Sequence, residues 1–357
     1  MKKNDKPKKN KEVSGRFIDL FCGIGGFRLG FEKNNFECVF SSDFNKNCQD
    51  TYLENFGERP FGDITQIDPN ELPEFEVLTG GFPCQPFSIS GKKLGFEDTR
   101  GTLFFDICRI LSIRRPKVVV LENVQHFVKH DKGRSLKVVL TSLQEFGYNV
   151  NYRVLNLSNF GLPQSRERVF IIGTLNGWFD FDKIKNIKSE PLESFLDNDD
   201  ETDVFLEPNE YTILDHPKKQ PSGLIFCGYR NKNRFTTKGI RPGTDHLSRV
   251  HRQPNRIYSI KGYHPTLPSQ ETSGRFFIYN PDKKYVRKLK ITECYRLMGF
   301  PENYIKNKSL GESYRQIGNS VGVNITTEIS RQIIEQGLLS YEPQREIIGD
   351  LRNLNFV

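Results

Sequence analysis

Short apolar runs alternate with segments of helical spacing through the first half of the chain. The runs are rich in β-branched and aromatic residues, and each is followed by a stretch in which apolar residues recur every three or four positions. Strands that alternate with helices are typical of a parallel sheet covered by helices. The pairs of strand and helix expected from this pattern are 16–21 with 27–34, 37–43 with 45–55, 76–81 with 101–114, and 117–124 with 135–146.

Two runs, at 118–121 and 169–175, are apolar almost throughout. Parallel strands that are buried on both faces have this composition, so we expect both runs to be parallel strands of one sheet. In a sheet of this kind, ligands bind at the carboxyl ends of the strands. The residues that directly follow each run are therefore the candidates for function.

The alternation stops after Leu175. A stretch rich in Pro, Gly, Asn and Arg follows, with short strand-like pieces at 255–260 and 274–280, and helical patterns return at 292–300 and 324–339. A chain of 357 residues is long enough for one large domain and one smaller domain. The expected boundaries are 1–14 for a basic disordered tail, 15–190 for the first domain, 191–290 for a second domain with an acidic linker, 291–317 for a hinge, and 318–357 for a return to the first domain.

Charge is distributed unevenly along this plan. The formal net charge is +8, but residues 224–290 hold fifteen Lys or Arg against three Asp or Glu, a local net of +12. Residues 176–223 hold five against twelve, a local net of −7. The basic stretch indicates a polyanionic partner such as nucleic acid. For the acidic stretch, a solvated surface is an equally good interpretation.

Several classes of protein are disfavoured. No stretch approaches the roughly 18 apolar residues that a membrane helix requires, and the basic N-terminus lacks the apolar core of a secretory signal. The seven cysteines are odd in number and never form a CxxC pair, which argues against a disulfide framework or a zinc site. We expect a soluble, cytoplasmic protein with no metal and no membrane partner.

The first apolar run ends in a glycine-rich turn, DLFCGIGGF at 19–27. Closely spaced glycines let the chain turn tightly and let a ligand approach the backbone. Arg28 replaces the third glycine of a dinucleotide fingerprint, and no GKS or GKT motif is present, which disfavours NAD and ATP. Asp43 can accept hydrogen bonds from ribose hydroxyls, Phe44 can lie against a purine ring, and Asp63 can contact an adenine amine. Each could also be a plain turn residue or cap, but together they favour an adenosyl cofactor.

Cys84 lies between Pro83 and Pro86, directly after the run at 76–81. The prolines stiffen the backbone, and the following polar loop does not resemble a core, so Cys84 is the candidate nucleophile. The other six cysteines are expected to be small core residues. Glu122 ends the next expected strand, which should be buried on both faces. A carboxylate at this position either has a functional role or caps the following helix.

The sequence QSRER at 164–168 places Arg166 and Arg168 on the same side of a strand, where they can hold a carboxylate or a phosphate. FCGIGG, GFPCQPFS, ENV, QSRER and the QIGNSV of 316–321 occur in the order and spacing of the cytosine-5 DNA methyltransferases. The chain resembles a bacterial restriction-modification member of that family. The likeness covers 16–175 and about 287–330 and is densest through 81–107.

The resemblance implies an α/β fold, with a Rossmann-like domain that binds S-adenosylmethionine and a smaller, strand-and-loop-rich target-recognition domain across a cleft. It implies double-stranded DNA as substrate, a cognate restriction endonuclease as functional partner, and a monomer on DNA. The Cys84 thiolate would add to carbon 6 of a flipped-out cytosine, because this addition makes carbon 5 nucleophilic. Glu122 would act at ring N3, and Arg166 and Arg168 would position Glu122 and the base carbonyl and help to form the thiolate.

Further site residues follow from the motifs. The expected cofactor contacts are Phe21, Gly23, Ile24, Gly25, Gly26, Asp43, Phe44, Asp63, Ile64, Pro83, Leu103, Asn319, Ser320 and Val321. The expected DNA contacts are Gln85, Ser88, Ser90, Arg100, Arg230, Arg234, Arg249, Arg252, Arg256 and Thr266. The composition of 85–103 suits a loop that closes on a phosphate backbone. The stretch from 248 to 276 resembles recognition domains for GCNGC-type sites.

Four alternatives compete with this interpretation. One branch of the fold family modifies transfer RNA with the same cysteine and glutamate, but its CFT signature is absent here. A non-catalytic DNA-binding relative would be expected to lack the nucleophile. An oxidoreductase is disfavoured by Arg28, and an enzyme resembling thymidylate synthase would have no use for the glycine-rich turn.

Overall fold

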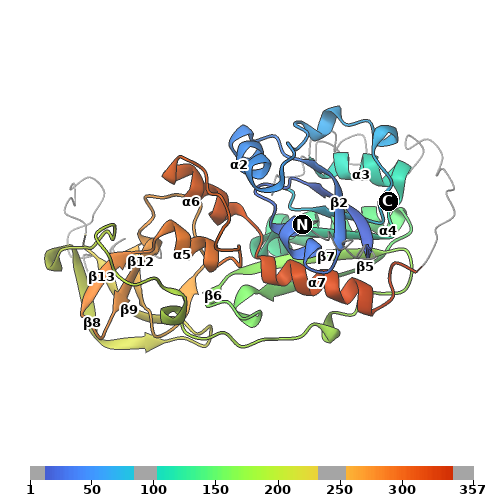
Figure 1. The fold of residues 1–357 in the computed structure, drawn as a ribbon. Coiled ribbons are helices and arrows are strands. Elements are labelled where there is room, and N and C mark those ends of the chain that lie inside the picture. Colours follow the sequence, from blue (N-terminus) through green and yellow to red (C-terminus); the bar gives the residue numbers. More distant parts are fainter. Residues whose placement is uncertain (1–12, 84–102, 232–254, 341–357) are drawn as a thin grey trace, which may run out of the picture.

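The computed structural model describes residues 13–83, 103–231 and 255–340, and two sheets organise them (Figure 1). The larger sheet has the strand order β2-β1-β3-β4-β7-β5. Its strands are β1 (Gly15–Leu20), β2 (Phe36–Ser42), β3 (Val77–Gly80), β4 (Val118–Val124), β5 (Asn149–Asn156) and β7 (Glu167–Thr174). The helices between them are α1 (Gly26–Glu32), α2 (Lys46–Phe56), α3 (Leu103–Arg114) and α4 (Arg134–Glu145). Each strand and helix pair expected from the sequence is therefore present.

The direction of β7 corrects one expectation. β1 is parallel to β2 and β3, and β3 is parallel to β4, but β7 runs antiparallel to both β4 and β5. The prediction of a parallel strand at 169–175 is therefore wrong. The run is apolar because both faces of β7 are covered, and a ten-residue connection from β5 can join antiparallel neighbours without a crossover helix.

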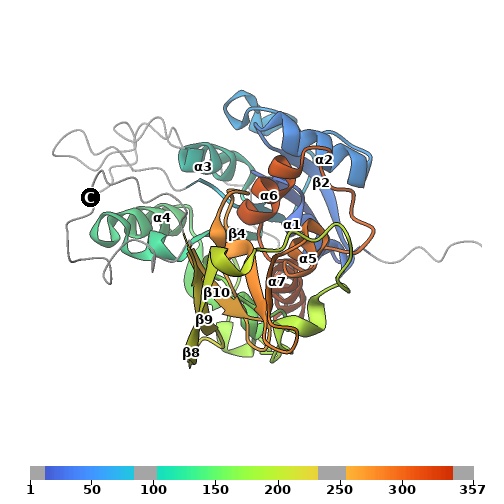
Figure 2. The same cartoon turned by 90° about the vertical axis from the view of Figure 1, so that its left-hand side faces the viewer.

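Helices cover both faces of this sheet (Figure 2). On one face, α1 and the C-terminal helix α7 (Val323–Glu335) pack on Phe17, Val118 and Phe170. On the other face, α3 and α4 pack on Ile18, Val119 and other strand residues. The helical pattern at 324–339 thus corresponds to α7, which lies against the first helix of the chain.

Glycines allow α1 and α7 to approach closely. A Cβ atom on Gly30 would lie 2.0 Å from Thr326 Oγ1, so only hydrogen fits there. The Thr326 hydroxyl donates to the Gly26 carbonyl at 3.0 Å, and the Ser330 hydroxyl donates to the Gly30 carbonyl at 3.3 Å. Hydroxyls of α7 therefore bind carbonyls of the helix that follows the glycine-rich turn.

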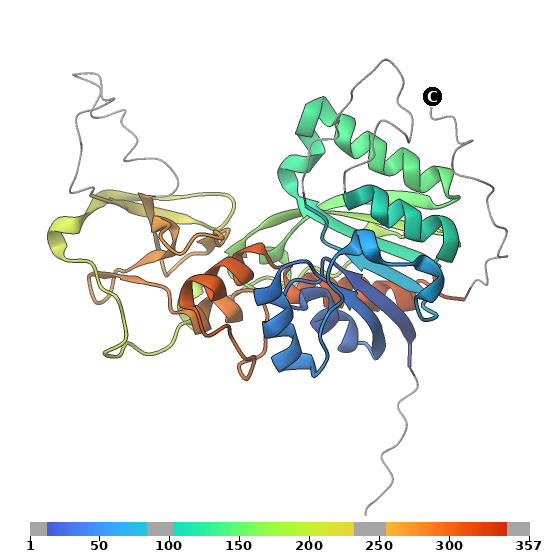
Figure 3. The same ribbon diagram turned by 90° about the horizontal axis from the view of Figure 1, so that it is seen from above.

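The second sheet is mostly antiparallel and lies to one side of the first, with α5 (Ile291–Arg296) and α6 (Leu310–Asn319) between them (Figures 1 and 3). Its order is β13-β12-β10-β9-β8. The strands are β8 (Tyr211–Lys219), β9 (Ile225–Arg230), β10 (Arg256–Ser259), β12 (Phe277–Asn280) and β13 (Tyr285–Lys288). The sequence pattern singled out the segments of β10 and β12 as examples of strand-like pieces. β8 and β13 carry several polar residues, whereas β9 is largely apolar. A short pair, β6 (Gln164–Ser165) with β11 (His264–Pro265), links the chain of the second sheet to the first domain.

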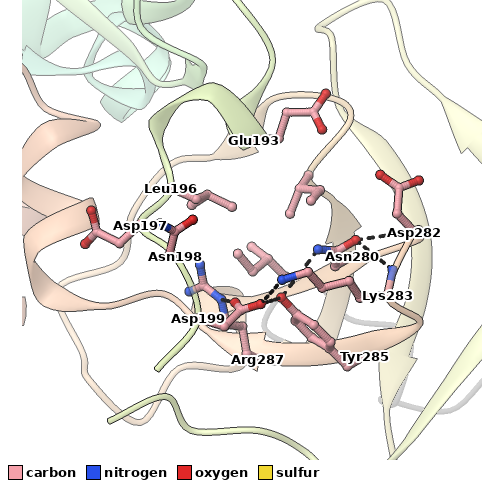
Figure 4. Close-up of a pocket in the computed structure, with 12 residues that line it drawn as sticks. Glu193, Leu196, Asp197, Asn198, Asp199, Asn280, Asp282, Lys283, Tyr285 and Arg287 are labelled. Carbon is pink, nitrogen blue, oxygen red and sulfur yellow. Dashed lines mark hydrogen bonds and ion pairs between the residues drawn. The ribbon is translucent and has the colours of Figure 1, made fainter. Parts of the chain in front are cut away.

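The acidic stretch is bound to the basic one. Asp199 accepts hydrogen bonds from Lys283 at 2.5 Å and from Arg287 at 3.2 Å, and it also bonds the Tyr285 hydroxyl. Figure 4 shows these four side chains gathered at a cavity of about 200 Å³ between the 193–199 segment and the β12–β13 hairpin. The guanidinium of Arg287 also pairs with the buried carboxylate of Glu293 at 2.7 Å. For Asp199, which is ion-paired and only 21% exposed, the interpretation as a solvated surface is wrong.

No helix within the described ranges is long and apolar enough to cross a membrane.

Candidate active site

The glycine-rich turn after β1 is open on one side. Phe21, Gly23 and Gly25 have φ values of 55°, 54° and 78°, which belong to the left-handed region that favours glycine. The Gly23 N–H donates to Asp43 Oδ2 at 2.8 Å, which ties the turn to the end of β2. A Cβ atom placed on Gly23 would have no neighbour within 4 Å. A ligand can therefore reach the backbone of this turn.

Asp43, which follows β2 directly, is bonded to the same turn, and Phe44 comes next in the chain. The second oxygen of Asp43 accepts the Asn45 N–H at 2.8 Å, and burial raises the pKa of this carboxyl. Phe44 is 79% exposed, which is exceptional for a large apolar ring. The Asp43 N–H donates to the Phe61 carbonyl at 2.9 Å, which brings the segment of Asp63 alongside. An acid with spare lone pairs next to an open aromatic face is suited to a ribose and a purine.

The other expected cofactor residues are distributed around this turn and sheet. A Cβ atom on Gly26 would lie 2.7 Å from Val321 Cγ1 and 2.9 Å from Ser320 Oγ, so the loop after α6 contacts the turn. Asn319 is exposed at the end of α6. Asp63 Oδ1 accepts the Thr65 N–H at 3.0 Å, as a helix cap does. Ile64 and Leu103 belong to the apolar cluster beneath, while Pro83 is exposed.

Glu122 and Arg168 form an ion pair at the carboxyl end of β4. Their Oε1 and Nε atoms are 3.0 Å apart, and the side chains are only 12% and 13% exposed. Because Phe170 is the partner of Glu122 in the β4–β7 ladder, Arg168 is its diagonal neighbour on the same face. Burial raises the pKa of Glu122, while the Arg168 and Arg166 charges oppose this rise.

The chain that leads to Cys84 runs past this ion pair. A Cβ atom on Gly81 would lie 3.3 Å from Glu122 Oε2, and the Asn123 amide donates to the Phe82 carbonyl at 2.9 Å. Cys84 itself lies outside the described residues, as do the DNA-contact candidates Gln85, Ser88, Ser90, Arg100, Arg234, Arg249 and Arg252. The described segment therefore ends at Pro83, one residue before the cysteine.

Arg166 differs from Arg168 in its surroundings. It is 1% exposed, and its Nη2 donates to the Gly318 carbonyl at 2.9 Å and to the Ser320 carbonyl at 2.6 Å. The structure thus brings Arg166 to the loop of 318–321 that also contacts Gly26.

The described DNA-contact candidates are not on one surface. Arg230 lies 4.4 Å over the Phe277 ring, whereas Arg256 lies 5.3 Å over the Phe226 ring. Because Arg256 pairs with Tyr229 in the β9–β10 ladder, Arg230 points to the opposite face of the sheet. Thr266 is attached to the first domain, where its hydroxyl donates to the Ser165 carbonyl at 2.8 Å.

Two polar residues of the quoted motifs were not predicted to position the site. Gln164 is fully buried; its Nε2 donates to the Leu297 carbonyl at 2.9 Å, and its Oε1 accepts the Leu267 N–H at 3.1 Å. Asn123 is the second, because its side-chain amide donates to the Phe82 carbonyl at 2.9 Å. Both residues stand in a motif near a charged candidate, and this was the only signal for them in the sequence. Such a place does not predict which groups the side chain will contact.

The strand order, the reversed β7 and the open turn after β1 define an α/β methyltransferase. The C-5 cytosine-specific DNA methylase family matches residues 15–335, and the chain belongs to this family. It is therefore a DNA (cytosine-5-)-methyltransferase, of the type II class of restriction-modification systems, and S-adenosylmethionine is its methyl donor.

Similar proteins agree with this membership. The chain is 40% identical over 330 residues to the type II methyltransferase M.HhaI of Haemophilus parahaemolyticus, which covers 91% of this chain and 96% of the relative. It is 41% identical over 318 residues to M.HaeII of Haemophilus aegyptius, with coverages of 89% and 92%. Among solved structures, the S. pombe Dnmt2 methyltransferase has the same fold, with a TM-score of 0.63 at 20% identity over 90% of this chain and 99% of that chain.

Proposed function

We propose that the protein methylates carbon 5 of a flipped-out cytosine in duplex DNA through a covalent adduct with Cys84. The Cys84 thiolate attacks carbon 6, while Glu122 donates a proton or a strong hydrogen bond to ring N3. Carbon 5 then takes the methyl group that bound S-adenosylmethionine supplies. Water or hydroxide removes the carbon 5 proton, the bond between sulfur and carbon 6 breaks with release of the Cys84 thiolate, and ring N3 returns its proton to Glu122.

The buried ion pair of Glu122 with Arg168 is the observation that carries this proposal. A carboxyl whose pKa is raised by burial is a better proton donor near neutral pH than an exposed one. Arg168 orients this carboxyl, and Gly81, three residues before Cys84, leaves room only for a small side chain beside it. We assign Arg166 a positioning role, because its guanidinium binds the carbonyls of Gly318 and Ser320.

The residues around the first turn fit S-adenosylmethionine. The open space at Gly23, the carboxylate of Asp43 and the exposed ring of Phe44 are suited in turn to the methionine part, the ribose and the adenine. We propose that Phe21, Ile24 to Gly26, Asp63, Ile64, Pro83, Leu103 and Asn319 to Val321 complete this site.

We propose that residues 15–190 with the return at 318–357 form the catalytic domain, and that 191–290 form the target-recognition domain, joined by the hinge at 291–317. Lys283, Arg287 and Lys290 are paired with carboxylates of the acidic stretch, so they are poor candidates for phosphate contacts. Arg230, Arg256 and Thr266 remain candidates for DNA contact, together with Gln85, Ser88, Ser90, Arg100, Arg234, Arg249 and Arg252.

The cellular role follows from the type II class. We propose that the enzyme works as a monomer in the cytoplasm and protects host DNA from a cognate restriction endonuclease, with a GCNGC-type target. Methylation mapping of DNA from cells that express the protein identifies the target. Preferential labelling of transfer RNA over duplex DNA in vitro would contradict the proposed substrate.

Trapping with 5-fluorocytosine tests the nucleophile. Fluorine at carbon 5 cannot leave as a proton does, so the wild-type enzyme should stay covalently attached to a modified duplex in the presence of cofactor. Cys84→Ser should give no attached product on a denaturing gel. Cys38→Ser is the control, because Cys38 is a half-buried residue of β2 and should leave trapping intact. Survival of the adduct in Cys84→Ser would overturn the assignment.

A further inference from the structure

A tyrosine from the C-terminal part of the chain holds the glycine-rich turn. The buried hydroxyl of Tyr304 donates to the Ile24 carbonyl at 2.6 Å, across 280 positions of sequence. On the opposite side, the turn is tied to β2, through Cys22 N–H to the Ser42 carbonyl at 3.0 Å and Gly23 N–H to Asp43. Tyr304 therefore fixes the middle of the turn from a separate part of the fold.

The ring of Tyr304 is itself held in place. It packs edge-on against Phe300, with centroids 4.9 Å apart, and lies 5.8 Å from the Tyr295 ring and 6.4 Å from the Phe56 ring. A ring enclosed on several sides has few alternative rotamers. The position of its hydroxyl, and so of the Ile24 carbonyl, is therefore set by packing.

The residues after Tyr304 hold α2 in the same way. The side chain of Asn55 makes two hydrogen bonds of 2.8 Å with the backbone N–H and carbonyl of Ile305. The Gln316 amide donates to the Asn47 carbonyl at 2.9 Å and accepts the Thr51 hydroxyl at 3.2 Å. Helix α2 begins at Lys46, two residues after Phe44, so these bonds hold the helix that follows the two candidate cofactor contacts, Asp43 and Phe44.

We propose that Tyr304, Ile305 and Gln316 act as a brace that sets the affinity for S-adenosylmethionine, with Tyr304 as its main positioning residue. The inference rests on the proposed assignment of the Phe21 to Gly26 turn and Asp43 to the cofactor. A turn held in its binding conformation before the ligand arrives loses less entropy on binding. Without the hydroxyl of Tyr304, the Ile24 carbonyl is released and part of the binding free energy is spent on ordering the turn.

Tyr304→Phe tests the brace with two matched controls. Tyr314 and Tyr148 are also buried, and their hydroxyls donate to the Leu289 carbonyl at 2.7 Å and the Pro116 carbonyl at 2.8 Å. Each Tyr→Phe change removes one hydroxyl and leaves one carbonyl without its donor. The thermal midpoint without cofactor should therefore fall by a similar amount in all three variants.

The variants should differ in cofactor binding. By calorimetry, the Kd for S-adenosylhomocysteine should rise about three- to tenfold in Tyr304→Phe, the range expected for one lost hydrogen bond, and stay at the wild-type value in both controls. In steady-state assays, Tyr304→Phe should raise KM for S-adenosylmethionine and leave kcat and KM for DNA unchanged. Wild-type affinity in Tyr304→Phe, or equal weakening in all three variants, would overturn the brace.

A fourth variant separates failure of the brace from failure of the cofactor site. Asp43→Ala should weaken binding of S-adenosylhomocysteine more than Tyr304→Phe does, because it removes a proposed direct contact. If Asp43→Ala weakens binding and Tyr304→Phe does not, the site stands and the brace fails. If Asp43→Ala binds normally, the assignment of the site itself is wrong.

Discussion

At the scale of one residue, Asp19 is a buried acid near the end of β1, just before the glycine-rich turn. Its side chain is fully buried, and Oδ1 accepts the Thr79 hydroxyl at 2.9 Å. Burial raises the pKa of this carboxyl to about 7, against the opposing effects of the Thr79 hydrogen bond and the Arg28 charge. The ionisation of Asp19 therefore affects the stability of the folded state.

The raised pKa of Asp19 predicts a pH-dependent loss of stability. The unfolded chain ionises this group near pH 3.8 and the folded chain near pH 7, so the folded state binds more protons between these values. The contribution of Asp19 to the free energy of unfolding is fully present below pH 3.8. It is lost as the pH rises to about 7, by up to roughly 1.4 kcal/mol per pH unit. Asp19→Asn should lack this loss.

The measurement is the thermal midpoint of wild type and Asp19→Asn at about pH 5, 6, 7 and 8. The thermal midpoint of Asp19→Asn should rise relative to that of the wild type as the pH increases to 7, and the difference between the two should then level off. Taking the difference cancels the titration of other groups. Parallel curves across the whole range would show that Asp19 ionises normally in the folded protein.

At the scale of elements, the packing of α1 on α7 opposes local helix propensity. Alanine in place of a helical glycine normally stabilises a helix by about 1 kcal/mol. At Gly30, however, a Cβ atom would lie 2.0 Å from Thr326 Oγ1 and 2.7 Å from the Thr327 backbone nitrogen. The methyl group would push the two helices apart, and the backbone of α7 cannot yield as a flexible side chain does.

Gly30→Ala should therefore destabilise the protein by about 1 to 3 kcal/mol, the cost of overpacking, despite the gain in helix propensity. Thermal unfolding measures the change. Gly62→Ala is the control, because its Cβ atom would meet only Gln49 Nε2, at 3.9 Å, and its midpoint should hardly move. A stabilised Gly30→Ala would mean that propensity outweighs the contact of α1 with α7.

At the scale of the whole molecule, a buried charge network joins three parts of the chain. They are the acidic stretch of residues 176–223, called the acidic connector below, the second sheet and the hinge. Arg287 on β13 is 2% exposed and pairs with Asp199 of the connector and with Glu293 of α5. The side chains of Glu293 and Asp203 are completely buried. Charges in such positions are tolerated only while they are paired.

Arg287→Met should cost about 3 to 5 kcal/mol, because it leaves the Glu293 carboxylate buried without its cation. Arg315→Met is the control, since Arg315 and its partner Glu312 are 44% and 25% exposed, and its cost should stay below about 1 kcal/mol. Adding Glu293→Gln to Arg287→Met should restore part of the lost stability, as judged by thermal midpoints. No recovery in the double variant would contradict the assignment of the cost to an unpaired charge.

Local pattern predicted the alternating elements of the first domain well. Strands such as β1 and β4 are short and apolar, and α3 and α4 have regular helical spacing, so each is evident without knowledge of its neighbours. β8 and β5 were not predicted, because edge strands with one open face carry polar residues. The direction of β7 was predicted wrongly, because an apolar composition reports burial on both faces and not the orientation of neighbouring strands.

By itself, the sequence determined the chemistry that this protein can perform. The glycine-rich turn, Cys84 between two prolines, Glu122 at a strand end and the two arginines are local features whose side-chain types limit the possible reactions. Only the tertiary structure decided which groups cooperate: Arg168 with Glu122, Arg166 with the 318–321 loop, Tyr304 with Ile24, and the acidic connector with Arg287. These contacts join segments far apart in the chain, and which of them form depends on the packing of whole elements, about which the spacing of residues within one segment carries no information.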